Sequence, residues 1–299
     1  MNNLINKYSS IWIALLLFSG CEQIDPLKEE QYVKQIYIVG ASAVVSQFVM
    51  PYQSTPSDAY ISLATGGSLK IDKDVSVSVI HDDQAIKWYN NKYMIDAPAK
   101  YRILEATNYT IPKMSTTIKA GEVYGRMPFS VTTKGLHCDS LYALTFKIDQ
   151  VSDYQKVVKD SVLILNLNLV NDYSGTYQLN IARSNMIKNN AGVWEKGTTT
   201  NLSTTRLLKA VDENTVRLFN EVKAEQRSSY TSHEEYFNAI KKYGVNLSKS
   251  TDGTFVISPW ADLAIVDPGT CKYTDDTFTF VYDYMDGTTR YRIEGTLRK

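Results

Sequence analysis

The chain has 299 residues, which is enough for two domains of ordinary size. Its 32 basic residues balance its 32 acidic residues, so no net charge favours nucleic acid or an anionic membrane surface, and we expect no nucleic-acid partner. Tyrosine is abundant, with 21 residues, and it is frequent both in β-strands and on surfaces that bind polar ligands.

The first expected element is a lipoprotein signal peptide over residues 1–20. Lys7 supplies a positive charge, residues 11–18 form an unbroken apolar run, and a Ser-Gly pair precedes Cys21. The run is shorter than the roughly 20 residues that span a bilayer, so it predicts a signal-peptide core. Small residues before a cysteine are what a lipoprotein signal peptidase requires, so we expect lipid on Cys21. The alternative is a secretory signal with an incidental cysteine.

Residues 21–32 are polar and are predicted to be a flexible tether. Acyl chains contribute about 0.8 kcal/mol per buried methylene, and two or more chains give durable anchoring. We therefore expect an outer-membrane lipoprotein whose folded part is exposed at the cell surface.

Residues 33–170 are predicted to form an antiparallel β-sandwich of the immunoglobulin-like type. Apolar and small polar residues alternate in 60–64 and 75–80, as they do in half-buried strands. Other strand-like segments are 34–39, 115–122, 125–132, 142–148 and 161–167. Turn signals between the segments indicate a sandwich, with 86–93 as a short helical insertion.

Residues 171–299 are predicted to form a lipocalin-like antiparallel barrel, or an open two-layer sandwich, with one helix. We expect the helix to begin after Ser232, with Glu235 completing a capping box, and to end at Gly244. Asp252-Gly253 and Asp286-Gly287 are each expected to form a type I′ hairpin turn. The strand-like segments are 173–181, 203–208, 215–219, 277–284 and 288–297.

No catalytic or metal-binding spacing is evident, so we expect neither an enzyme nor a cofactor. The three histidines form no zinc-type pair, and no nucleophile or phosphate-binding motif occurs. His81 with Asp82 and Asp83 is either a metal ligand or a solvated turn. The pairing of Cys138 with Cys271 is left open, because the two thiols are far apart in sequence.

Aromatic residues beside polar ones are the candidates for a ligand site, because sugars pack their C–H faces on flat rings while polar groups bond their hydroxyls. Trp194 lies in a polar, glycine-containing hairpin tip at 188–197 and is the first candidate, with core burial as the alternative. Tyr230, in a loop beside an arginine, is expected to flank it. Trp260 is a further ligand candidate or a core residue. The terminal hairpin carries three more tyrosines, namely Tyr282, Tyr284 and Tyr291. A single strand pair does not reveal which face of the hairpin is exposed to solvent.

Several segments resemble a known family in their order along the chain. These are Trp88-Tyr89-Asn90, residues 101–105, residues 117–122 and Tyr142-Ala143-Leu144. The pattern resembles an N-terminal domain of unknown function in surface lipoproteins of gut Bacteroidetes, encoded in polysaccharide-utilisation loci. The Tyr-Ser-Gly-Thr-Tyr segment at 173–177 and the terminal Asp-Gly hairpin are similar to the lipocalin-like domain that often follows. The resemblance implies glycan capture and supplies no catalytic residues.

The leading hypothesis is a non-catalytic, outer-membrane-anchored glycan-binding lipoprotein whose second domain holds the site. Its expected partners are a polysaccharide or oligosaccharide, the outer membrane through the lipid, and a starch-utilisation-type porin complex. One alternative is an adhesin or pilus-like subunit whose sheet edges pair with other chains. Another is a glycoside hydrolase, which needs two carboxylates facing one cleft. A third is a carrier of a small hydrophobic ligand in a lipocalin-like cup.

Overall fold

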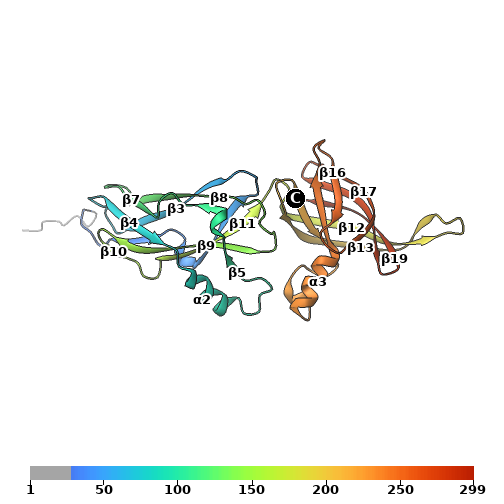
Figure 1. Cartoon of the computed structure of the whole chain (residues 1–299), viewed down its shortest axis with the longest axis horizontal. Coiled ribbons are helices and arrows are strands. Elements are labelled where there is room, and N and C mark those ends of the chain that lie inside the picture. Colours follow the sequence, from blue (N-terminus) through green and yellow to red (C-terminus); the bar gives the residue numbers. More distant parts are fainter. Residues whose placement is uncertain (1–27) are drawn as a thin grey trace, which may run out of the picture.

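The computed structural model describes residues 28–299, which form two β-rich domains lying end to end (Figure 1). The expected signal peptide, the lipidation site Cys21 and the first part of the tether lie outside the described residues. A sandwich is followed by a closed barrel, so the predicted all-β architecture is confirmed. Within residues 28–299, no helix combines the length and apolar character needed to cross a membrane.

The first domain packs two sheets around a single apolar core. One sheet has the order β10-β1-β3-β8-β6, and the other has the order β2-β11-β9-β4-β7, with β5 added beside β9. The strands of the first sheet are β1 (Gln35–Ile38), β3 (Ser57–Gly66), β6 (Tyr109–Thr110), β8 (Tyr124–Val131) and β10 (Gln155–Lys156). Those of the second are β2 (Val45–Pro51), β4 (Val75–Ile80), β5 (Tyr101–Ile103), β7 (Ser115–Ile118), β9 (Leu141–Val151) and β11 (Val162–Val170).

Helix α2 (Asp83–Tyr93) explains why the central residues of β9 and β11 are buried in unbroken runs instead of alternating. Ile86 of the helix packs on Ala143 and Ile164, so the central strands of this sheet are buried on both faces. The insertion is thus an 11-residue helix and longer than the expected turn. Short 3-10 turns occupy Ala41–Ala43, Ala106–Asn108 and, in the second domain, Arg227–Ser229.

In the second domain, eight antiparallel strands close into a barrel, because β12 pairs with both β13 and β19. Their alternate side chains point inward and build a second apolar core that is rich in aromatic residues. The strands are β12 (Gly175–Lys188), β13 (Trp194–Ala210), β14 (Thr215–Phe219), β15 (Gly244–Lys249), β16 (Phe255–Pro259), β17 (Ala264–Thr274), β18 (Thr277–Asp286) and β19 (Thr289–Arg298).

Helix α3 (His233–Tyr243) begins where the sequence predicts. The Ser232 hydroxyl accepts a hydrogen bond from the backbone N–H of Glu235 at 3.0 Å. The Glu235 carboxylate reaches back one residue further than a capping box requires, to the N–H of Thr231 at 2.7 Å.

The end of α3 differs from the expected left-handed glycine cap. Gly244 has φ −73° and leads directly into β15. A Cβ atom at this position would lie 2.7 Å from the carbonyl oxygen of Ile240 and 2.8 Å from the Cβ of Trp260. Glycine is therefore required here by the close approach of neighbouring atoms and not by a positive φ.

The predicted type I′ turns at the two Asp-Gly pairs are wrong. A type I′ turn needs positive φ at both central residues, and in each Asp-Gly pair only the glycine has it. Gly287 (φ 60°) is the first of two loop residues in the last hairpin, the place glycine takes in a type II′ turn. Both central residues are positive instead at Asp275 (φ 49°) and Asp276 (φ 56°), between β17 and β18. Aspartate tolerates this conformation better than most residues.

Candidate binding site

The barrel has an opening on one side, between β13 and the segment that follows β14. Although β13 is 17 residues long, it pairs with β14 only through Lys209 and Ala210. The remainder of β13 lacks a partner on that side, and a cavity of 480 Å³ lies there, within the range of about 300–1,000 Å³ typical of small-molecule sites. It is lined by Ile181, Arg183, Asn185, Thr198, Thr200, Asn201, Leu202, Asn220, Glu221, Val222, Tyr291 and Ile293, which we call the barrel cavity.

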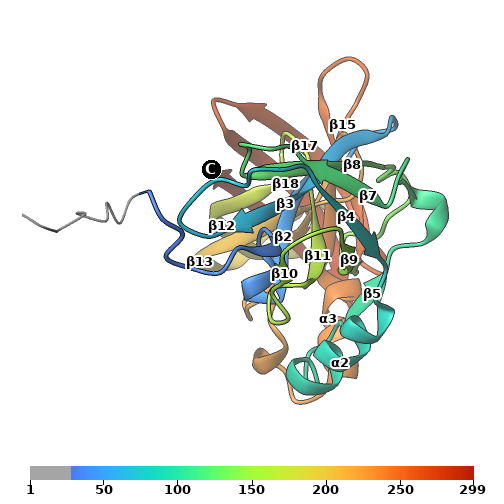
Figure 2. The same cartoon turned by 90° about the vertical axis from the view of Figure 1, so that its left-hand side faces the viewer.

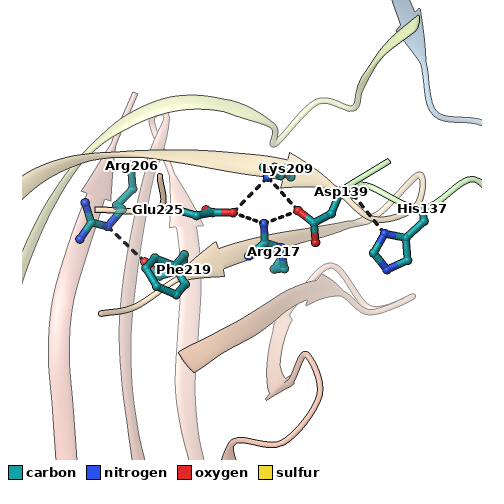
Figure 3. Close-up of polar contacts among 7 residues, drawn as sticks. All are labelled: His137, Asp139, Arg206, Lys209, Arg217, Phe219 and Glu225. Carbon is teal, nitrogen blue, oxygen red and sulfur yellow. Dashed lines mark hydrogen bonds and ion pairs between the residues drawn. The ribbon is translucent and has the colours of Figure 1, made fainter. Parts of the chain in front are cut away.

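Arg206 holds the wall of the barrel cavity in place. Its guanidinium is buried and donates to the backbone carbonyl oxygen of Phe219 at 3.2 Å (Figure 3). It also donates to the carbonyl oxygen of Lys223 at 3.2 Å and to that of Glu221. These carbonyl groups would otherwise need a neighbouring strand. The side chain thus replaces the missing strand pairing and fixes residues 220–223 across the opening.

One tyrosine ring, that of Tyr291, lines the floor of the barrel cavity, and two buried tyrosines of β18 lie next to it in the barrel. Tyr291 stacks on Tyr284 with 5.6 Å between ring centroids, and Tyr282 pairs across the strands with Ile293. Burial raises the pKa of both Tyr282 and Tyr284 above the ordinary value, so both hydroxyls stay protonated. The Tyr282 hydroxyl accepts a hydrogen bond from the amide of Asn220. The floor is therefore aromatic, uncharged and rigid.

The side chains around the cavity are polar but incompletely paired. Arg183 lies over the Tyr291 ring, with its guanidinium carbon 4.1 Å from the ring centroid. Its Nε atom is buried without a hydrogen-bond partner, and so are the Oδ1 atoms of Asn185 and Asn220. Unpaired buried polar groups are rare because each costs about 1–3 kcal/mol. All three atoms belong to residues that line the barrel cavity, and each is itself covered by neighbouring atoms.

A second polar group, the interdomain cluster, joins the two domains (Figure 3). Asp139, from the loop between β8 and β9, accepts hydrogen bonds from Lys209 and Arg217 of the barrel, each at 2.7 Å. Glu225 pairs with the same two cations. Burial alone would raise the pKa of Asp139, but the charges of Arg217 and Lys209 outweigh it and hold that pKa below its ordinary value.

Two further contacts secure the same junction. The His137 ring packs edge-on against Trp260 with 5.3 Å between centroids. Beside them, His233 Nε2 at the start of α3 lies 3.1 Å from the backbone oxygen of Asp96, which follows α2. Figure 2 shows the two helices on the same side of the molecule. The domains are therefore held in one relative orientation.

The side chains of His137, Cys138 and Asp139 also have the residue types of a metal site, with ligand atoms within 4.8 Å of one another. Their surroundings oppose a cation. Asp139 is already paired with two positive side chains, and burial raises the pKa of the Cys138 thiol to about 11, which keeps it protonated. This group is best understood as part of the domain junction.

Two family models match the chain in sequence. A model for an N-terminal domain matches residues 32–155, and a model for a C-terminal domain matches residues 161–298. The chain has this two-domain family architecture. No curated protein matches it.

Solved structures of similar fold come from Bacteroides. A protein of unknown function from Bacteroides ovatus has a TM-score of 0.65 at 16% identity and covers 88% of this chain and 93% of its own. A multidomain protein from the same species has a TM-score of 0.60 at 16% identity, with 86% and 90% covered. An auxiliary nutrient binding protein from Bacteroides thetaiotaomicron has a TM-score of 0.58 at 17% identity, with 87% and 92% covered. At this identity, the likeness establishes the fold.

The three aromatic candidates from the sequence do not form one site. Trp194 is 36% exposed, as a surface platform requires, but Lys188 and Arg290 lie 5.0 Å and 5.2 Å from its ring, and it does not line the barrel cavity. Trp260 is half-buried at the domain junction, the packing alternative. Tyr230 is 8% exposed and does not flank Trp194, because it packs on α3.

Tyr230 nevertheless lines a smaller cavity of 370 Å³ beside α3, which shares Glu221 with the barrel cavity. Its hydroxyl is buried without a partner. Tyr230 therefore stays a candidate ligand residue, as an extension of the barrel cavity. Trp88 of the family-like segment is 48% exposed on α2.

Sequence reasoning missed Arg183 and Asn220. A signal for Arg183 exists, because it continues the inward-facing series Tyr177, Leu179 and Ile181 on β12, where an apolar residue is expected. Asn220 follows β14 in a loop, and no local pattern distinguishes it.

Proposed function

We propose that this chain is a non-catalytic glycan-binding lipoprotein, anchored in the outer membrane through Cys21, with the barrel cavity as its binding site. The observation that carries the proposal is a cavity lined by the Tyr291 ring and mainly polar side chains, among them Arg183, Asn185 and Asn220. Sugars match that combination, because their C–H faces pack on rings while their hydroxyls donate and accept hydrogen bonds.

Two further observations support this role. One structure of the same fold is described as an auxiliary nutrient binding protein. In addition, the described chain begins at the end of the sandwich that lies away from the barrel (Figure 1). A lipid on Cys21 would then leave the sandwich as a spacer that carries the barrel away from the membrane surface.

A binding role without turnover is favoured by the acids around the cavity. Glycoside hydrolysis needs two carboxylates that flank one sugar bond. Among the described residues that line the barrel cavity, Glu221 is the only acid. Incubating the protein with each bound oligosaccharide and analysing the products tests this point, and the appearance of shorter sugars would refute it.

The binding experiment is isothermal calorimetry of residues 22–299, which contain both domains, against a panel of polysaccharides and oligosaccharides. Tyr291→Leu removes the ring that lines the cavity, and we expect at least a tenfold loss of affinity. Trp194→Ala is the matched control, because it removes an aromatic ring from the outer surface. Loss of binding only in Trp194→Ala would move the site to the hairpin. No binding to any glycan would refute the function.

The anchor is tested on the full chain in its own cell type. Cys21→Ser should release the protein from the membrane fraction, and mass spectrometry of the unaltered chain should find acyl groups on its N-terminal cysteine. Membrane association that persists in Cys21→Ser, together with an unmodified cysteine, would refute lipidation. Protease digestion of intact cells separates surface exposure from an inward orientation.

A further inference from the structure

Arg183 suggests which class of sugar the barrel cavity takes. We propose that the ligand is an acidic sugar unit of the uronic acid type, whose carboxylate pairs with the Arg183 guanidinium. This inference rests on the proposed function and deepens it, because a cavity for neutral sugars does not need a cation. The argument has three steps, which concern charge, geometry and the remaining polar groups.

Charge comes first. Arg183 is the only cation among the residues that line the cavity. Its nearest carboxylate is that of Asp286, and Arg183 Nη2 lies 3.8 Å from it. The same carboxylate lies 2.8 Å from Nζ of Lys242, a much closer partner. Two cations thus share the Asp286 carboxylate, and Arg183 has only the long contact to it. A ligand anion would give this guanidinium a close partner.

Geometry favours a carboxylate. A guanidinium presents its donors as a planar fork that matches the two oxygens of a carboxylate. In Arg183, Nε has no partner and Nη2 has only the long contact to Asp286, so one edge of the fork is nearly unused. The guanidinium carbon lies 4.1 Å from the centroid of the Tyr291 ring, and this cation–π contact restrains the group beside the cavity.

The other polar groups suit the hydroxyls of the same sugar unit. The side chains of Asn185 and Asn220 line the cavity, and so do Thr198 and Thr200, whose hydroxyls both donate and accept. Glu221 is the one anion of the lining. Burial is the main cause that raises the pKa of Tyr230 and Tyr243 on the α3 side, and the charge of Glu221 adds to it.

The test is calorimetry of residues 22–299 with glucuronate and galacturonate against glucose and galactose. We expect the acidic sugars to bind about 10- to 100-fold more tightly than their neutral counterparts, the usual worth of a charge-assisted hydrogen bond. Arg183→Gln should abolish the preference, measured as the ratio of acidic to neutral affinity in the same variant. Arg183→Lys should restore part of it, because the charge returns without the fork. Arg298→Gln, on an exposed arginine of β19, is the matched control.

Each outcome has one meaning. Equal binding of acidic and neutral sugars by the unaltered protein would overturn the inference and leave the function intact, and it needs no variant to fold. Tighter binding of a sulfated sugar than of the uronates would overturn the carboxylate assignment. A preference that survives in Arg183→Gln would place the anion elsewhere. No binding of any sugar would refute the proposed function itself.

Discussion

Asp139→Asn should destabilise the whole molecule, although Asp139 lies in a loop. The substitution keeps the shape of the side chain and removes its negative charge. In the interdomain cluster two cations, Lys209 and Arg217, face two anions, Asp139 and Glu225. The Arg217 side chain is fully buried and that of Lys209 is 24% exposed. The variant therefore leaves one positive charge without an anion in a site largely closed to water.

The size of the effect follows from this arrangement. Removing one partner of a buried ion pair costs about 3–5 kcal/mol when the other charge is left uncompensated. Here Glu225 still serves both cations, and Lys209 can turn toward water, so we expect about 2–3 kcal/mol. In the double variant Asp139→Asn with Lys209→Met the charges balance again. Its loss should be smaller than the sum of the single losses by about 1–2 kcal/mol.

Urea unfolding followed by tryptophan fluorescence measures these differences. Trp88 reports on the sandwich, and Trp260 reports on the junction. Asp58→Asn is the matched control, because Asp58 is exposed on β3 and makes no ion pair in the described part of the chain; it should change stability by less than about 0.5 kcal/mol. If Asp139→Asn behaves like Asp58→Asn, the cluster does not hold the domains and the reasoning fails.

The pH dependence of the same variant has a defined sign. The cluster holds the pKa of Asp139 below its ordinary value of about 3.9, so the carboxylate stabilises the fold above that value. This contribution is lost as the pH falls through the lowered pKa of the folded state. The stability difference between wild type and Asp139→Asn should therefore be constant near neutral pH and shrink in acid. A difference that grows in acid would contradict the assignment.

Three further predictions concern single positions. Arg206→Met should cost about 2–4 kcal/mol and weaken the binding of any ligand in the barrel cavity, because the carbonyl groups of Phe219, Glu221 and Lys223 lose their donor. Urea unfolding measures the first effect and calorimetry the second. Gly244→Ala should cost about 1–3 kcal/mol of stability, because the added Cβ clashes with Ile240 and Trp260. Gly253→Ala has open space but a φ of 85°, so it should cost only about 1 kcal/mol. Burial raises the pKa of Cys138 to about 11 and that of Cys271 to about 12, so only about one thiol in a thousand or fewer is ionised at pH 8. Both thiols should therefore resist iodoacetamide until the chain unfolds. Rapid labelling of the folded chain would contradict this.

The two-residue period of the strands made the all-β class predictable, because strands such as β3, β4 and β8 bury one face and expose the other to solvent. The start of α3 was predictable from Ser232, whose hydroxyl satisfies a free backbone donor within three residues. Such features depend on neighbours along the chain. The turn types were not predictable, because φ at Asp252 and at Asp275 depends on strand register and twist, and the dipeptide alone does not set it.

The candidate site shows the same division. Local sequence properties drew attention to Trp194, Tyr230 and Trp260, but a ring becomes a platform or a core residue only when other segments cover it. The barrel cavity exists because β13 is longer than β14 and Arg206 bridges the gap beside it. The gap arises when eight strands of unequal length close into a barrel. Arg183 and Asn220 lie 37 positions apart in the chain and line the same cavity only after closure. Strand patterning and helix capping depend on residues that are close in the chain, so they were predictable from the amino-acid sequence. The cavity and the domain junction required the folded chain, because the groups that form them are distant until packing brings them together.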